Sequence, residues 1–102
     1  NHYAYGAVYD WIFGVAAGIK ILPDGAGYKH IEIKPAPERR IGFLKSKLKI
    51  NNGVLSSYWY YSGNKINFEF EVPEGTVAEI ILPNGKCEVV SGKNVSFSIL
   101  AE

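Results

Sequence analysis

The sequence contains no methionine, one cysteine and two histidines. Cys87 has no second cysteine to pair with, so an intramolecular disulfide is excluded, and we interpret this residue as a small apolar filler on a strand. One cysteine and two histidines are too few for a zinc site of the usual spacing, and we expect neither a metal nor a cofactor. Because the chain has no translation start of its own and no secretory signal at its beginning, we expect it to be a piece of a longer protein.

An excess of charge of either sign is also lacking. Eleven Lys and Arg face ten Asp and Glu, which leaves a formal net charge of +1, and the charges are scattered along the chain. Binding to nucleic acid or to an anionic membrane surface requires a basic patch, so neither is expected as a partner. With 102 residues and 47% hydrophobic side chains, the chain is long enough for one packed domain with a fragment of another, and too short for a multi-domain enzyme.

The segment from Tyr3 to Ile19 is nearly all apolar and predicts a helix. Its apolar residues recur at spacings of three and four, and they are Tyr5, Val8, Ile12, Val15 or Ala16, and Ile19. Asp10 is its only charge, so we expect other helices to enclose it, and the rest of the chain offers none. A membrane span is the alternative, but it needs about 20 apolar residues and this run is shorter. Turn residues at positions 23–27 then end the helix.

After Gly27 the apolar residues recur with a period of two to the end of the chain, which predicts strands. The clearest alternation places Ile66, Phe68, Phe70 and Val72 on an inner face. Short turn-forming separators favour hairpins, and hence antiparallel neighbours, while the longer run at 35–40 can cross between sheets. The pattern predicts an antiparallel β-sandwich with seven strands, at 30–34, 44–50, 54–61, 66–72, 76–82, 86–90 and 95–100.

The acidic residues offer no catalytic pair. Glycoside hydrolysis normally needs two carboxylates at one bond, and Glu69 and Glu71 are the closest approach to such a pair in this chain. The alternation that buries their apolar neighbours turns both glutamates toward solvent, so we interpret them as a solvated face. Asp10 differs, because an unpaired carboxylate in a buried helix is costly. It is either a structural acceptor or ion-pair partner, or part of an active-site shell.

Other candidates for binding are aromatic residues and histidines. Alternation splits the run at 58–61, so that Tyr58 and Tyr60 share one face and Trp59 and Tyr61 the other; one pair belongs to the core, and the other could stack on a sugar. His30 is expected at the surface or in an interface. His2 precedes the apolar helix, where free N–H groups gather, and either contacts a ligand or has a cap or packing role.

The beginning of the chain resembles a segment of the bacterial α-L-rhamnosidases, glycoside hydrolase family 78. The resemblance rests on Asn-His-Tyr-Ala-Tyr-Gly-Ala-Val at positions 1–8, Asp10-Trp11, and Ala-Gly-Ile at positions 17–19. It continues through positions 27–35 and the strand of Trp59, where it is mainly one of pattern. Tyr9 departs from the family, which often has Gly there.

The resemblance implies an (α/α)6-barrel catalytic domain followed by a C-terminal β-sandwich. Residues 1–22 would be the last barrel helix and residues 23–102 the sandwich. The family releases terminal α-L-rhamnose with inversion, and its two catalytic glutamates lie upstream of the Asn-His-Tyr block, outside this chain. By the same resemblance, His2 would contact the sugar, and Asp10 and Trp11 would belong to the supporting helix.

The leading prediction is therefore a mainly β, non-catalytic accessory fragment of an α-L-rhamnosidase-like glycoside hydrolase. Its expected partners are the rest of the catalytic barrel and, through the parent enzyme, a rhamnose-containing glycan or glycoside. Two alternatives remain, a carbohydrate-binding module that uses the strand at 58–61 and a purely structural or oligomerisation sandwich. Binding of sugar by the isolated chain would separate the carbohydrate-binding module from both the accessory fragment and the structural sandwich.

Overall fold

A computed structural model describes residues 17–22, 29–50 and 53–101. These residues form six strands, and the prediction of a mainly β fold is confirmed. The strands are β1 (Ile19–Leu22), β2 (Lys29–Ile33), β3 (Phe43–Ile50), β4 (Gly53–Ser62), β5 (Lys65–Ile81) and β6 (Cys87–Leu100). In the part of the chain that the structure describes, no helix has the length and apolar character of a membrane span.

The predicted helix at 3–19 lies outside the described residues except at its end. That end is wrong, because Ile19 begins β1, which pairs antiparallel with β2 through Ile19↔Ile33 and Leu22↔His30. The sheet therefore starts ahead of the boundary predicted between residues 22 and 23. Strand β1 was not predicted, because its four residues directly follow the apolar run that was assigned to a helix.

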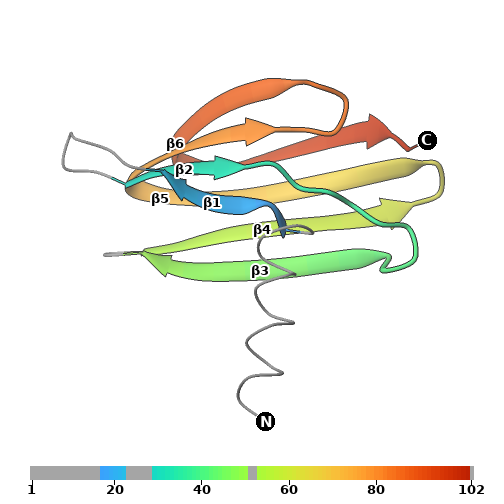
Figure 1. Cartoon of the computed structure of the whole chain (residues 1–102), viewed down its shortest axis with the longest axis horizontal. Coiled ribbons are helices and arrows are strands. Elements are labelled where there is room, and N and C mark those ends of the chain that lie inside the picture. The colour runs from blue at the N-terminus through green and yellow to red at the C-terminus, as the bar shows by residue number, and fades with distance from the viewer. Residues whose placement is uncertain (1–16, 23–28, 51–52, 102) are drawn as a thin grey trace, which may run out of the picture.

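All six strands belong to one sheet, in the order β1-β2-β5-β4-β3, with β6 on β5 (Figure 1). The prediction of seven strands is wrong, because it divided two long strands into four and missed β1. Two predicted strands, 66–72 and 76–82, are parts of the single strand β5, and two others, 86–90 and 95–100, are parts of β6. Along one side of β5, its first half pairs with β4 and its second half pairs with β2.

A bend in the middle of β5 explains why two strands were expected there. The register with β6 shifts between Val72 and Val77. Pro73 has no N–H to donate to a neighbouring strand, and Gly75 and Gly92 have φ angles of 82° and 64°, which favour glycine. These turn-forming residues bend two long strands together instead of ending them.

The prediction that all neighbours are antiparallel is wrong for β2 and β5, which are parallel, with Ile31 opposite Ala78. The two expected sheets are also continuous with each other through β5 and β6. Buried side chains from both halves nevertheless form one cluster, so the curled sheet closes on a single core, as a sandwich does.

The core follows the alternation seen in the sequence. The predicted inner residues of β5, Ile66, Phe68, Phe70 and Val72, are all buried, which confirms that face. The Phe70 ring lies 6.2 Å from that of Phe68 and 6.1 Å from that of Phe97, measured between centroids. The second half of β5 adds Ala78 and Ile80. The other strands add Ile31, Ile33, Ile50, Leu55, Trp59 and Val90. Side chains at the alternate positions point outward and carry the candidate site.

Gly18 fixes the start of the sheet. Its φ angle is 69°, and its carbonyl oxygen accepts a hydrogen bond of 2.8 Å from the Lys34 N–H. A Cβ at this position would lie 1.9 Å from the Lys34 carbonyl oxygen, so the two backbones approach too closely for any side chain. Glycine is therefore required where the chain enters β1.

Candidate functional site

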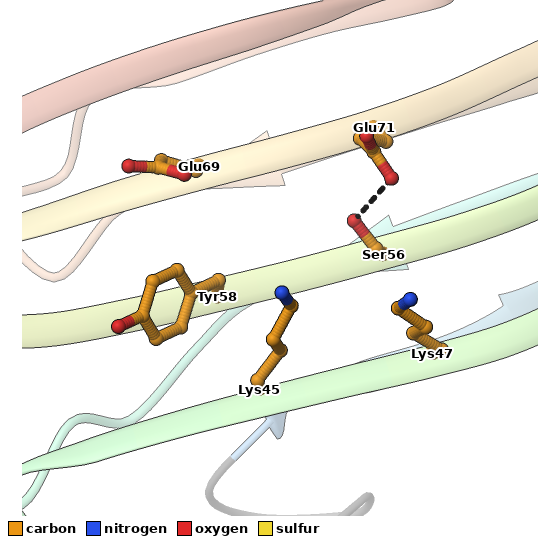
Figure 2. A pocket seen from close by; sticks show the side chains of 6 residues that line it. All are labelled: Lys45, Lys47, Ser56, Tyr58, Glu69 and Glu71. Atoms are coloured by element: carbon orange, nitrogen blue, oxygen red, sulfur yellow. Dashed lines mark hydrogen bonds between the residues drawn. The ribbon is translucent and has the colours of Figure 1, made fainter.

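A shallow depression of about 150 Å³ lies on the outer face of β3, β4 and β5. Its lining is polar and charged, and consists of Lys45, Lys47, Ser56, Tyr58, Glu69 and Glu71. Figure 2 shows β4 running between the two lysines on β3 and the two glutamates on β5. The depression is thus built from three neighbouring strands, two residues from each.

Strand register places these residues in two rows across the sheet. In one row Lys47 is opposite Ser56, which is opposite Glu71. In the second row Lys45 is opposite Tyr58, which is opposite Glu69. Neighbouring strands lie about 4.8 Å apart, so β4 keeps the lysine backbone about 10 Å from the glutamate backbone.

The contacts inside the depression leave most of its charged groups open to solvent. Ser56 Oγ donates a hydrogen bond of 3.0 Å to Glu71 Oε1, and Lys45 Nζ lies 5.6 Å from the centroid of the Tyr58 ring. Within residues 17–22, 29–50 and 53–101, no ion pair joins the lysines to the glutamates. Both glutamates are exposed, which confirms that they form a solvated face.

The aromatic run on β4 divides between the two faces as predicted. Trp59 is 1% exposed in the core, and its ring contacts the edge of Tyr61 at a centroid distance of 6.1 Å. Tyr58 and Tyr60 are the outward pair, with ring centroids 5.0 Å apart. Phe43 lies opposite Tyr60 on β3 and is 61% exposed. An aromatic strip therefore continues from the depression along the outer face.

Sequence reasoning divided the tyrosines between two faces without saying which pair points outward, and it did not find the site that the outward pair helps to form. The alternating lysines of β3 and glutamates of β5 were visible, and each set was assigned to solvent. Their position on either side of β4 depends on strand order and register, which alternation along one strand does not specify.

The depression is suited to binding and not to hydrolysis. Glu69 and Glu71 are two residues apart on one strand and point from the same face, so they cannot lie on opposite sides of a glycosidic bond. In the described ranges, no group of three or more His, Cys, Asp or Glu side chains is placed to hold a metal ion. Hydrogen bonds and ring contacts are what this surface offers a ligand.

Other sequence candidates lie elsewhere. His30 Nε2 is 2.7 Å from Glu79 Oε2, and the two side chains are 30% and 43% exposed, so this histidine is a half-buried partner across β2 and β5. The interpretation of Cys87 as an apolar filler is wrong, because the residue is exposed and its thiol contacts the Gly85 carbonyl at 3.5 Å. His2, Asp10 and Trp11 lie outside the described residues.

Comparison with protein families gives a match that covers most of the chain. Residues 18–97 match the bacterial α-L-rhamnosidase C-terminal domain. The first matched residue is the glycine next to β1, so the matched region and the sheet begin together.

Comparison with curated proteins finds an α-L-rhamnosidase of Formosa agariphila, 35% identical over 96% of this chain and 10% of that protein. An α-L-rhamnosidase of Streptomyces avermitilis is 32% identical over 81% of the chain and 8% of that protein. The chain therefore spans about a tenth of the length of the curated relatives it matches.

Solved structures agree with the sequence matches. The α-L-rhamnosidase of Aspergillus terreus superposes with a TM-score of 0.81 at 27% identity, over 97% of this chain and 12% of that one. The Streptomyces avermitilis α-L-rhamnosidase, solved as a complex with L-rhamnose, gives a TM-score of 0.72 at 28% identity, over 97% of this chain and 11% of that one. The curled sheet is thus a fold shared with parts of these enzymes.

Proposed function

The chain belongs to the bacterial α-L-rhamnosidase C-terminal domain family, and from this we propose that it serves an α-L-rhamnosidase-type glycoside hydrolase as a non-catalytic accessory domain. The enzyme would release terminal α-L-rhamnose with inversion of configuration. The observation that carries the proposal is the family match over residues 18–97. The two curated relatives described above are both named α-L-rhamnosidase, which agrees with it.

The non-catalytic role is supported by the arrangement of carboxylates in the described residues. Inverting glycosidases hold two carboxyl groups about 6.5–9.5 Å apart on opposite sides of the scissile bond. Glu69 and Glu71 project from one strand into an open depression that does not enclose a sugar. The acid and base would therefore come from another part of the enzyme.

In this proposal the residues before β1 contribute the last helix of an (α/α)6 catalytic barrel, and the sheet packs beside that barrel. Gly18 and Lys34 support such a junction, because their close backbone contact fixes the direction in which the chain enters β1. His2 would then reach the sugar from the barrel side, with Asp10 and Trp11 in the supporting helix.

Activity measurements on the longer protein that carries this chain test the proposal. We expect it to hydrolyse an aryl α-L-rhamnoside, with β-L-rhamnose as the first product by proton NMR, because inversion of an α-linkage gives the β-anomer. The 102-residue chain should be inactive in the same assay. Activity of the chain that is lost on changing one of its own acidic residues would contradict the accessory role, and α-L-rhamnose as first product would contradict inversion.

The role of His2 makes a separate prediction for the longer protein. A neutral imidazole donates from one nitrogen and accepts at the other, so it can bridge two sugar hydroxyls. His2→Ala should lower kcat/KM about tenfold to a hundredfold, because a buried hydroxyl loses its partner. His30→Ala is the matched control and should leave kcat/KM unchanged. A lower Tm with unchanged kcat/KM for His2→Ala would reduce His2 to a structural residue.

A further inference from the structure

The outer face of β3, β4 and β5 holds cations and anions apart. Lys45 and Lys47 line one side of the depression, and Glu69 and Glu71 line the opposite side, with β4 between them. In the part of the chain that the structure describes, the ion pairs are His30–Glu79 and Arg40–Glu38, and neither involves these residues. Ammonium groups only donate hydrogen bonds and carboxylates only accept them. The depression therefore offers donors from one side and acceptors from the other.

An aromatic surface lies between and beside these polar groups. Tyr58 is part of the depression, and Tyr60 and Phe43 continue the strip along the sheet. The core side of β4 is already filled by the buried ring of Trp59. Outward rings that the core does not use, one of them 61% exposed, are typical of an interaction surface.

The balance of charges selects the class of ligand. Two lysines and two glutamates cancel, so the surface attracts neither an anion nor a cation over a neutral molecule. Each hydroxyl of a sugar both accepts and donates, so one sugar ring can accept from a lysine and donate to a glutamate. The C–H face of the same ring can pack on an aromatic side chain. A neutral saccharide can therefore accept from the lysines, donate to the glutamates and pack on the aromatic rings at the same time.

We propose that this face binds a neutral oligosaccharide, with one sugar ring between the lysines and glutamates, where it replaces the Lys45 ammonium against the Tyr58 ring, and with the next rings against Tyr60 and Phe43. The site does not cleave its ligand, since it has no carboxylates on opposite sides of a bond. It is separate from the rhamnosidase activity proposed above and does not depend on it. Because the depression is shallow, the bound sugar keeps much of its contact with water and binding is weak.

An NMR titration of the whole 102-residue chain tests the proposal. The probes are a neutral rhamnose-containing oligosaccharide, cellohexaose, maltohexaose and, as the acidic counterpart, a hexamer of galacturonic acid. We expect at least one neutral probe to shift the ring-proton resonances of Tyr58 and Tyr60, and the acidic hexamer to bind more weakly. The affinity for the neutral probe should be the same at low and high salt, because screening acts on charged ligands.

Variants locate the response. Tyr58→Ala should lower the association constant about tenfold through loss of the stacking surface. Glu69→Gln should also lower it, without the change of shape that Tyr58→Ala brings. Glu88→Gln is the matched control, an exposed glutamate on β6 outside the depression, and should bind like the unmodified chain. Backbone amide spectra show that each variant is folded.

Three results would overturn the proposal. In the first, no neutral probe shifts the Tyr58 and Tyr60 resonances in a folded chain. In the second, binding occurs but survives both Tyr58→Ala and Glu69→Gln, so the ligand sits elsewhere. In the third, the resonances move with protein concentration in the absence of sugar, which would mean that the face is covered by a second copy of the chain.

Discussion

The two halves of the curled sheet share one core, but their strands pair differently, because the second half contains a parallel pair. In the first half, β3, β4 and the beginning of β5 follow one another along the chain and pair as antiparallel neighbours. In the second half, β2 pairs in parallel with the end of β5, so that Ile33 lies opposite Ile80. Antiparallel neighbours form from local turns, whereas the parallel pair needs distant segments to meet first. We therefore expect the parallel pair to form after the antiparallel neighbours of the first half.

A change in the shared core should have the largest effect and should spread through both halves. Phe68 is fully buried on β5 beside Phe70, and Phe68→Ala removes a large ring from close packing. We expect a loss of about 3–5 kcal/mol in the free energy of unfolding, measured with denaturant. Glu69→Ala, the outward neighbour, should stay within about 0.5 kcal/mol. Equal effects at both positions would show that the two faces are not distinguished in solution.

The junction at Gly18 should separate the two halves. Gly18→Ala combines a positive φ with a Cβ that would meet the Lys34 carbonyl oxygen, so we expect a loss of about 2 kcal/mol or more. Amide hydrogen exchange should quicken in β1 and β2 and stay slow in β3 and β4. Gly63→Ala is the matched control, because Gly63 has a similar φ of 61° and open space around its Cβ position, and it should cost less. Uniform exchange through the sheet would mean that the halves open together.

The same difference between the halves explains what the sequence could predict. The inner face of β5, the division of the tyrosines and the solvated glutamates follow from alternation with period two, which one strand reports about itself. The parallel β2–β5 pair depends on contacts between distant segments, which alternation does not report. Strand β1 was missed because its residues continue the apolar run before them. The turn residues at 73–75 were recognised, but their effect, a bend instead of a hairpin, depends on β6 continuing alongside.

The candidate site shows the limit in the same way. The lysines of β3 and the glutamates of β5 were correctly assigned to a solvated face, and the depression appears only when β4 is placed between them. A site built from several neighbouring strands therefore cannot be predicted from the pattern of each strand alone. The prediction for His2 is of the opposite kind, because it rests on a local motif and needs no register; it stays a prediction.

Removing a buried hydroxyl from the core face of the first half should have a smaller effect and should stabilise the fold, unlike the two changes above. Ser57 is 1% exposed, and its Oγ has no hydrogen-bond partner among the residues that the structure describes. Removing an unpaired buried hydroxyl recovers the cost of its desolvation, so Ser57→Ala should raise the free energy of unfolding by about 1 kcal/mol. Ser62→Ala, at an exposed position of the same strand, should change it little. A loss on Ser57→Ala would show that the hydroxyl makes a stabilising bond in solution.

The smallest effect is expected for the ion pair that bridges the parallel strands of the second half. His30 and Glu79 approach to 2.7 Å, but both side chains are partly exposed, so solvent weakens their attraction. A double-mutant cycle with His30→Ala and Glu79→Gln should give an interaction energy of about 0.2–1 kcal/mol. The neighbouring residue Ile31 is fully buried, and Ile31→Ala should cost about 2–5 kcal/mol. The parallel pairing is then held by the core it shares with the first half, and a coupling energy as large as the cost of Ile31→Ala would show instead that the ion pair holds it.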